Sequence, residues 1–140
     1  MEAGKLMLER IRSLLARNKT FAIETTLATR SYKNLVIRAK EQGYEVVLVF
    51  FWLRSPMQAE QRVALRVASG GHNIPKEVIH RRYWRGIQNL FEIFIPIVDS
   101  WSLYNNSDDI TPIVENGEIR NQSSVSYTHL RAHETSLHLV

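Results

Sequence analysis

The sequence contains no cysteine and no apolar run long enough to cross a membrane. Without cysteine, disulfide bonds, thiolate metal sites and a cysteine nucleophile are excluded. The longest apolar run, residues 46–53, is far shorter than the roughly 20 residues of a transmembrane helix, and no signal peptide is recognised. We therefore expect a cytoplasmic domain without a membrane partner, a class that 140 residues with 44% hydrophobic content fit.

Acidic residues are scarce in the middle of the chain. Residues 54–86 carry seven basic and two acidic side chains, whereas residues 87–140 carry two basic and seven acidic ones. Six of the seven basic residues are arginine, whose planar guanidinium group binds phosphate or carboxylate through two parallel hydrogen bonds. A protein that binds duplex nucleic acid usually spreads its charge over a longer surface, so this short block favours a compact anion over nucleic acid.

The first half of the chain reads as alternating helices and strands. Apolar residues at helical spacing predict helices over residues 2–17 and 31–42. Residues 21–27 (FAIETTL) have the branched and aromatic content of a strand, although Glu24 falls in their middle. Residues 45–53 form a near-continuous apolar run, which is typical of a parallel strand covered on both faces by helices. Strand, helix and strand would then form one βαβ unit.

The second half is expected to contain two helices followed by two strands. The expected elements are helices over residues 55–68 and 75–96 and strands over residues 101–104 and 110–114. Glycines 70 and 71 form a glycine hinge between the two arginine-bearing helices. A plain turn explains the two glycines equally well. The expected fold class is α/β, with helices layered on a parallel sheet.

Residues 121–140 differ in character from the rest. They hold three of the five histidines and show no core periodicity. Their string SYTHLRAHETSLHLV resembles a translated sequencing adapter, so we expect a non-native, disordered tail after a domain of residues 1–120. His129, His133 and His138 could share a helical face as metal ligands, but the adapter interpretation is preferred and no metal site is predicted.

Three stretches in this order, FAIETTLATRSY, FFWLRSP and RVALRVASGGHNIPKEVIHRRYWRGIQNL, resemble the zeta toxin family of P-loop kinases. The likeness covers roughly residues 2–118. It implies a three-layer P-loop kinase-like fold with a helical lid. It also implies an activity that transfers the γ-phosphoryl group of ATP, with Mg²⁺, to a small hydroxyl acceptor. That acceptor is an amino-sugar nucleotide in the toxins themselves, and the resemblance allows an antitoxin protein as a partner.

The resemblance assigns roles to arginines of the basic block. Arg66 and Arg82 resemble catalytic lid arginines that neutralise charge developing on the transferred group. The same two arginines, together with Arg62 and Asn105, are expected to bind the nucleotide cofactor. The simpler interpretation of each arginine is a solvated helix face, and turn chemistry explains Asn105 equally well.

The resemblance also predicts a substrate side. Glu24 resembles the family's substrate-binding carboxylate, with Thr25 and Thr26 offering hydroxyl groups beside it. Ligands of open α/β sheets gather at the carboxyl edge of the strands, which agrees with this position. A solvent-facing charge on an edge strand is the alternative for Glu24.

The sequence departs from the family in two respects. It contains no GxxxxGK[ST] motif, whose backbone amides cradle phosphate and whose Lys and Ser/Thr serve phosphate and magnesium. The family's aspartate base also has no counterpart here. We therefore interpret the chain as a partial kinase domain, without the first strand and the P-loop, that is inactive by itself.

Two other interpretations stay open. The block from Arg62 to Arg85 could belong to a non-catalytic module that binds an anion or nucleic acid. Alternatively, the chain has no function alone, because a missing central strand would leave its neighbour with unpaired backbone groups that favour aggregation.

Overall fold

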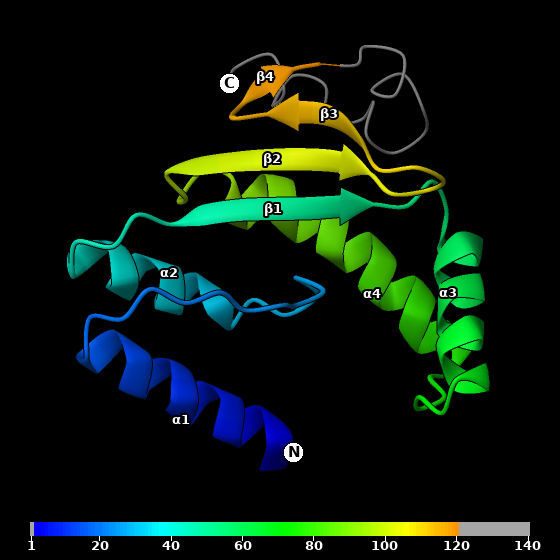
Figure 1. The fold of residues 1–140 in the computed structure, drawn as a ribbon, viewed down its shortest axis with the longest axis horizontal. Helices are drawn as coiled ribbons and strands as arrows, with labels where there is room; N and C mark the ends of the chain where they lie inside the picture. Colours follow the sequence, from blue (N-terminus) through cyan, green and yellow to red (C-terminus); the bar gives the residue numbers. More distant parts are fainter. Residues whose placement is uncertain (1, 121–140) are drawn as a thin grey trace.

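The computed structural model describes residues 2–120 as an α/β arrangement (Figure 1). In chain order the elements are α1 (Glu2–Ala16), α2 (Tyr32–Glu41), β1 (Val47–Trp52), α3 (Pro56–Ala68), α4 (Lys76–Asn89), the π-helical turn η1 (Leu90–Phe94), β2 (Ser100–Asn105), β3 (Thr111–Glu115) and β4 (Glu118–Ile119). The sequence therefore predicted every helix and the three longest strands. The expected tail, residues 121–140 with its three histidines, lies outside the described residues.

The four strands form one mixed sheet in the order β1-β2-β3-β4. β1 and β2 pair in parallel, whereas β2, β3 and β4 pair in antiparallel fashion. A parallel pair requires a crossover connection, which α3, α4 and η1 provide, while a short loop suffices for an antiparallel pair. The expectation of a parallel sheet is thus correct for β1 and β2 and wrong for β3 and β4, which follow β2 through short loops.

The strand expected over residues 21–27 does not form. This segment has no regular secondary structure, and Glu24, Thr25 and Thr26 are all exposed. Among the described residues no strand pairs with it, and a strand needs neighbours to be stable. Strand propensity measures how well a side chain fits a pleated, half-buried surface, and here no such surface is available. The expected βαβ unit is therefore absent as well.

β1 is an edge strand with one uncovered face. Val47, Val49 and Phe51 are 57%, 50% and 51% exposed, whereas the alternating residues Leu48 and Phe50 pack into the main core. The prediction that helices cover both faces of this strand is wrong. Its near-continuous apolar sequence meets helices on one face only.

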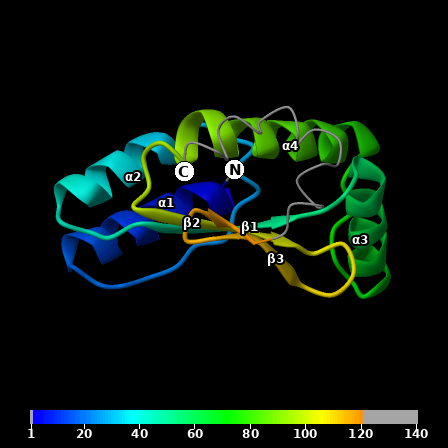
Figure 2. The same cartoon turned by 90° about the horizontal axis from the view of Figure 1, so that it is seen from above.

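The main core lies between the sheet and the α4–η1 segment. Its buried residues are Leu27, Trp52, Ile87, Leu90, Phe91, Ile93, Phe94, Trp101, Leu103, Ile113 and Val114. Figure 2 shows α2 and α4 on the same side of the sheet. Within residues 2–120 the exposed face of β1 carries no helix layer, so the expected three-layer architecture is not formed there.

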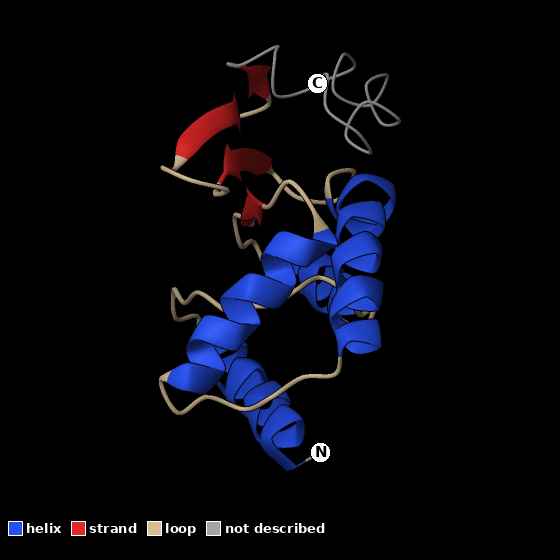
Figure 3. Ribbon diagram, turned by 90° about the vertical axis from the view of Figure 1, so that its right-hand side faces the viewer, coloured by secondary structure: helices blue, strands red, loops and turns tan. Residues whose placement is uncertain are grey.

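A second, smaller core holds the N-terminal helices together. Ile11 and Leu15 of α1 pack against Ala39 of α2. Figure 3 shows the strands gathered at one end of the molecule and α1 farthest from them. None of the helices in the described part has the length and apolar character of a membrane span.

The polar group that joins α2 to the sheet is Asp99. Its Oδ2 accepts a hydrogen bond from the Val46 N–H at 2.7 Å, and its Oδ1 lies 3.4 Å from Lys40 Nζ. The Val46 hydrogen bond, assisted by the Lys40 charge, lowers the pKa of the Asp99 carboxyl group. The stabilisation that follows is present above the ordinary pKa of an aspartate and is lost as pH falls through the lowered value.

The ends of α3 follow the expected local chemistry. Ser55 Oγ accepts a hydrogen bond from the Gln58 N–H at 3.2 Å, and Pro56 occupies the first turn, as the sequence predicted. At the other end Gly70 has a φ of +96°, and the Gly71 N–H donates to Arg66 O at 2.7 Å. This C-terminal turn accounts for both glycines, so their presence does not by itself indicate a lid hinge.

Replacing Val49 by lysine is expected to reduce self-association, because a lysine on an edge strand opposes pairing with another strand. Val49 is half exposed, so the free energy of unfolding should change by no more than about 1 kcal/mol. Sedimentation velocity over a range of protein concentrations measures the effect. Ile110→Lys adds the same charge at another exposed apolar position and is the control. Equal reduction by both variants would attribute the effect to net charge rather than to the β1 edge.

Candidate functional site

A polar concavity joins the segment before α2 to one side of α4. It has a volume of about 260 Å³ and is lined by Thr26, Ala28, Thr29, Arg81, Arg82 and Arg85. We call it the arginine pocket, and we call residues 25–29 the threonine loop. The pocket thus brings one residue of the predicted substrate side, Thr26, next to one of the predicted lid arginines, Arg82.

The threonine loop is shaped by its own hydroxyl groups. Thr25 Oγ1 accepts a hydrogen bond from the Leu27 N–H at 3.2 Å, and Thr26 Oγ1 accepts one from the Ala28 N–H at 3.3 Å. Thr29 Oγ1 accepts from the Ser31 N–H at 3.2 Å, just before α2 begins. A hydroxyl that accepts a bond keeps its own hydrogen to donate. Thr26 therefore presents an O–H donor at the pocket.

Two features of α4 hold the loop against the helix. Asn89 Nδ2 donates a buried hydrogen bond to Leu27 O at 2.7 Å. At Gly86, an added Cβ atom would lie 2.5 Å from Thr26 O, a distance that is shorter than the contacts of real Cβ atoms. Only glycine lets the loop backbone approach the helix at this point.

Arg81, Arg82 and Arg85 lie within little more than one turn of α4, and all three are exposed. None of them forms a hydrogen bond or ion pair with any residue in the described part of the chain. Three like charges that share a small concave surface attract anions. Their guanidinium groups suit phosphate oxygens in particular, because each offers several N–H donors in a fixed plane.

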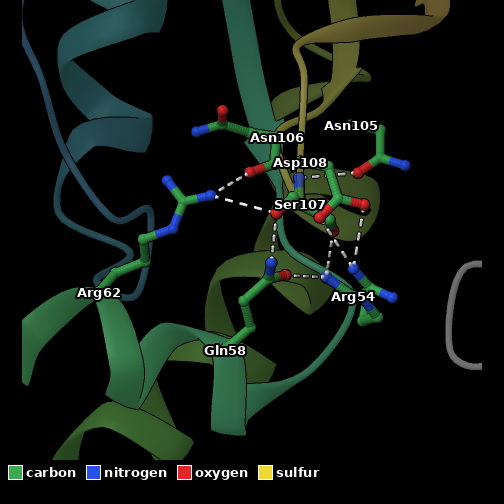
Figure 4. Close-up of polar contacts among 7 residues, drawn as sticks. All are labelled: Arg54, Gln58, Arg62, Asn105, Asn106, Ser107 and Asp108. Atoms are coloured by element: carbon green, nitrogen blue, oxygen red, sulfur yellow. Dashed lines mark hydrogen bonds and ion pairs between the residues drawn. The ribbon is translucent and has the colours of Figure 1, made fainter.

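Arg62 has a different environment from the pocket arginines. Its Nη2 donates to the backbone oxygens of Asn106 and Ser107 at 2.7 and 3.3 Å (Figure 4). Gln58 Nε2 donates to the same Ser107 oxygen at 2.5 Å. These hydrogen bonds hold the loop that follows β2. They also occupy N–H donors of Arg62 that a phosphate group would otherwise bind.

Asn105 contributes to the same group of hydrogen bonds. Its Oδ1 accepts a hydrogen bond from the Ser107 N–H at 2.9 Å, and the Ser107 hydroxyl accepts one from the Arg54 N–H at 3.0 Å (Figure 4). Arg54 also forms an ion pair with Asp108, with a distance of 3.2 Å between Nη2 and Oδ2. This side-chain hydrogen bond within a turn is the role that the sequence analysis gave as the alternative for Asn105.

The remaining predicted site residues lie outside the arginine pocket. Glu24 is exposed in the irregular segment, and Thr25 uses its hydroxyl to shape the loop. Arg66 is exposed near the end of α3. The structure therefore brings together Thr26 and Arg82 and does not bring Glu24, Arg62, Arg66 or Asn105 into the same pocket.

Sequence reasoning gave no role to two residues that hold the pocket together, Gly86 and Asn89. The dense arginine pattern at residues 81–85 was a signal for part of the pocket. Gly86 within a helical pattern was a second, weaker signal, since a glycine there costs helix stability and needs a reason. Asn89 carried no signal, because its partner Leu27 lies 62 residues earlier in the chain.

Comparison of the chain with protein-family models, with curated proteins and with solved structures found no match in any of the three. The resemblance to zeta toxins thus remains a prediction. In residues 2–120, no group of three or more histidine, aspartate or glutamate side chains is arranged to hold a metal ion.

Gly86→Ala is expected to destabilise the protein, although alanine normally favours a helix by about 1 kcal/mol. The added Cβ would displace the threonine loop, at an expected cost of about 1–3 kcal/mol. Gly4→Ala is the matched control, because Gly4 lies in α1 with nothing within 4 Å of an added Cβ. Urea unfolding followed by circular dichroism measures both. Stabilisation of both variants would contradict the close approach of loop and helix.

Proposed function

We propose that this chain is the acceptor-bearing and lid-bearing part of an ATP-dependent kinase of the zeta toxin type, with a P-loop kinase-like core. In this proposal the arginine pocket binds phosphate groups. The observation that carries it is the meeting of three arginines, none paired with an acidic group in the described chain, with a loop that presents threonine hydroxyls. The resemblance supplies the reaction class, and the pocket supplies the chemistry for binding.

The pocket residues suit phosphate oxygens in charge and in hydrogen bonding. Arg81, Arg82 and Arg85 each offer several N–H donors and carry a positive charge. The Thr26 hydroxyl adds a neutral donor from the threonine loop. Arg82 is proposed to neutralise charge that develops on a transferred phosphoryl group. Arg66 would have to reach the same ligand from α3.

ATP would supply the phosphoryl group, and the acceptor is proposed to be a small hydroxyl compound such as a sugar nucleotide. No carboxylate lines the pocket, so the pocket itself is not proposed to hold Mg²⁺. The sequence lacks a GxxxxGK[ST] motif. Phosphoryl transfer depends on positioning and charge stabilisation, so these residues alone are expected to bind phosphate with negligible turnover.

The structure disfavours one continuous nucleic-acid surface made from the block between Arg62 and Arg85. Arg62 is bonded to backbone oxygens of the loop after β2, whereas Arg81, Arg82 and Arg85 gather at the threonine loop. The free arginines therefore form a compact group rather than a stripe. A compact anion suits such a group better than a duplex backbone does.

Replacing Arg81, Arg82 and Arg85 together by glutamine is expected to weaken pyrophosphate and ATP binding at least about tenfold, because hydrogen bonds to charged groups are lost. Isothermal titration calorimetry at fixed ionic strength measures the dissociation constants. The control is a triple glutamine variant at Arg10, Arg12 and Arg38, which removes the same charge from α1 and α2.

Equal weakening in the two triple variants would reduce the effect to net charge, and no binding by the natural chain would overturn the proposed function. Tight, strongly salt-dependent binding of single-stranded or duplex nucleic acid without pyrophosphate binding would favour the nucleic-acid interpretation instead. Phosphorylation of a sugar nucleotide from Mg²⁺-ATP, above the level of an Arg66→Gln, Arg82→Gln variant, would refute the expected lack of turnover.

A further inference from the structure

Asn89 is a buried amide at the end of α4. It is 8% exposed, and its chain neighbours Ile87 and Leu90 are buried as well. Burying an amide among apolar groups costs free energy unless it forms hydrogen bonds. In the described part of the chain, the side-chain bond found for Asn89 goes to Leu27 O at 2.7 Å. The Asn89 side-chain amide therefore bonds to the threonine loop rather than to α4 itself.

Leu27, the residue that receives this bond, has an unusual backbone. Its φ is +58°, in the left-handed region that leucine rarely adopts, so this backbone conformation is strained. Its side chain is nevertheless buried in the main core. Backbone strain persists only where surrounding contacts enforce it. Here the enforcing contacts are the buried leucine side chain and the Asn89 hydrogen bond.

The strained residue lies between the two parts of the loop that line the pocket. Thr26 precedes Leu27, and Ala28 and Thr29 follow it. The left-handed turn at Leu27 therefore determines how Thr26 is oriented relative to Thr29. Because Asn89 fixes Leu27 O on α4, it also determines how these two threonines are placed relative to the arginines of that helix.

We propose that Asn89 is a positioning residue of the arginine pocket. It does not touch the ligand; it fixes the threonine loop on α4, so that the Thr26 and Thr29 hydroxyls share one phosphate with the arginines. This inference rests on the proposed function, because it names what holds that site together. Without the amide, the loop would leave its strained conformation and the hydroxyl donors would lose their alignment.

The test uses two variants of Asn89 and one control. Asn89→Leu keeps a similar volume but cannot donate to Leu27 O, and it is expected to weaken pyrophosphate binding about tenfold. Asn89→Gln keeps an amide donor, and its affinity should stay within about threefold of the natural chain. Gln88→Leu removes an amide from the neighbouring position, whose side chain hydrogen-bonds to Glu92, and should leave affinity unchanged. Affinities are compared well below the unfolding temperature of each variant.

A measurement on the natural chain keeps the proposal testable if the Asn89 variants do not fold. Pyrophosphate should shift the ¹⁵N–¹H resonances of the Asn89 side-chain amide, whereas those of Gln88 should not move. If Asn89 had a merely structural role, replacing it would lower the unfolding temperature without changing the affinity for pyrophosphate. Pyrophosphate would then leave the Asn89 side-chain resonances of the natural chain unshifted. A folded Asn89→Leu variant with unchanged affinity, or an unshifted Asn89 amide in a saturated complex, would overturn the positioning role alone. A natural chain that binds no pyrophosphate would overturn the proposed function and this inference together.

Discussion

The arrangement of this protein depends on the parallel pairing of β1 with β2. Two parallel neighbours cannot be joined by a tight turn, so the chain between them must leave the sheet, travel back along it and re-enter at the same end. The return path is α4 with η1, which buries Leu90, Phe94 and their neighbours against the strands. Once α4 lies there, its outward side is fixed next to the segment that precedes α2.

Much of this could be read from the sequence, because local chemistry determined it. The Ser55–Pro56 cap and the apolar spacing of the helices need no distant partner to be recognised. Residues 21–27 failed as a strand for the opposite reason, since strand formation depends on a neighbour that no local pattern reports. The contact between Asn89 and Leu27 could not be predicted either, because no local sequence pattern indicates that residues 62 positions apart lie together.

Arg62 and Arg82 illustrate the same limit for the candidate site. Both are arginines on amphipathic helices, and the resemblance to zeta toxins implied that both bind the nucleotide. The difference lies in what each one meets. Arg62 donates to backbone oxygens of the loop after β2, whereas Arg82 lines a pocket with Thr26 and Thr29 and has no hydrogen-bond partner among residues 2–120. Residue type indicated a potential for anion binding, and the surroundings determined which arginine kept it.

The crowding of positive charge in the arginine pocket links the folded state to the ions of its solution. Arg81 and Arg85 lie one turn apart on α4, and like charges at this spacing repel each other in the folded helix, so their repulsion opposes folding. An anion that enters the pocket removes this repulsion and binds only the native form, so it raises the free energy of unfolding by mass action. With the proposed anion binding, the measured thermal stability depends on the anions in the buffer. A melting temperature measured in phosphate would then refer to the anion-bound native protein, and one measured in a zwitterionic buffer would refer to the anion-free native protein.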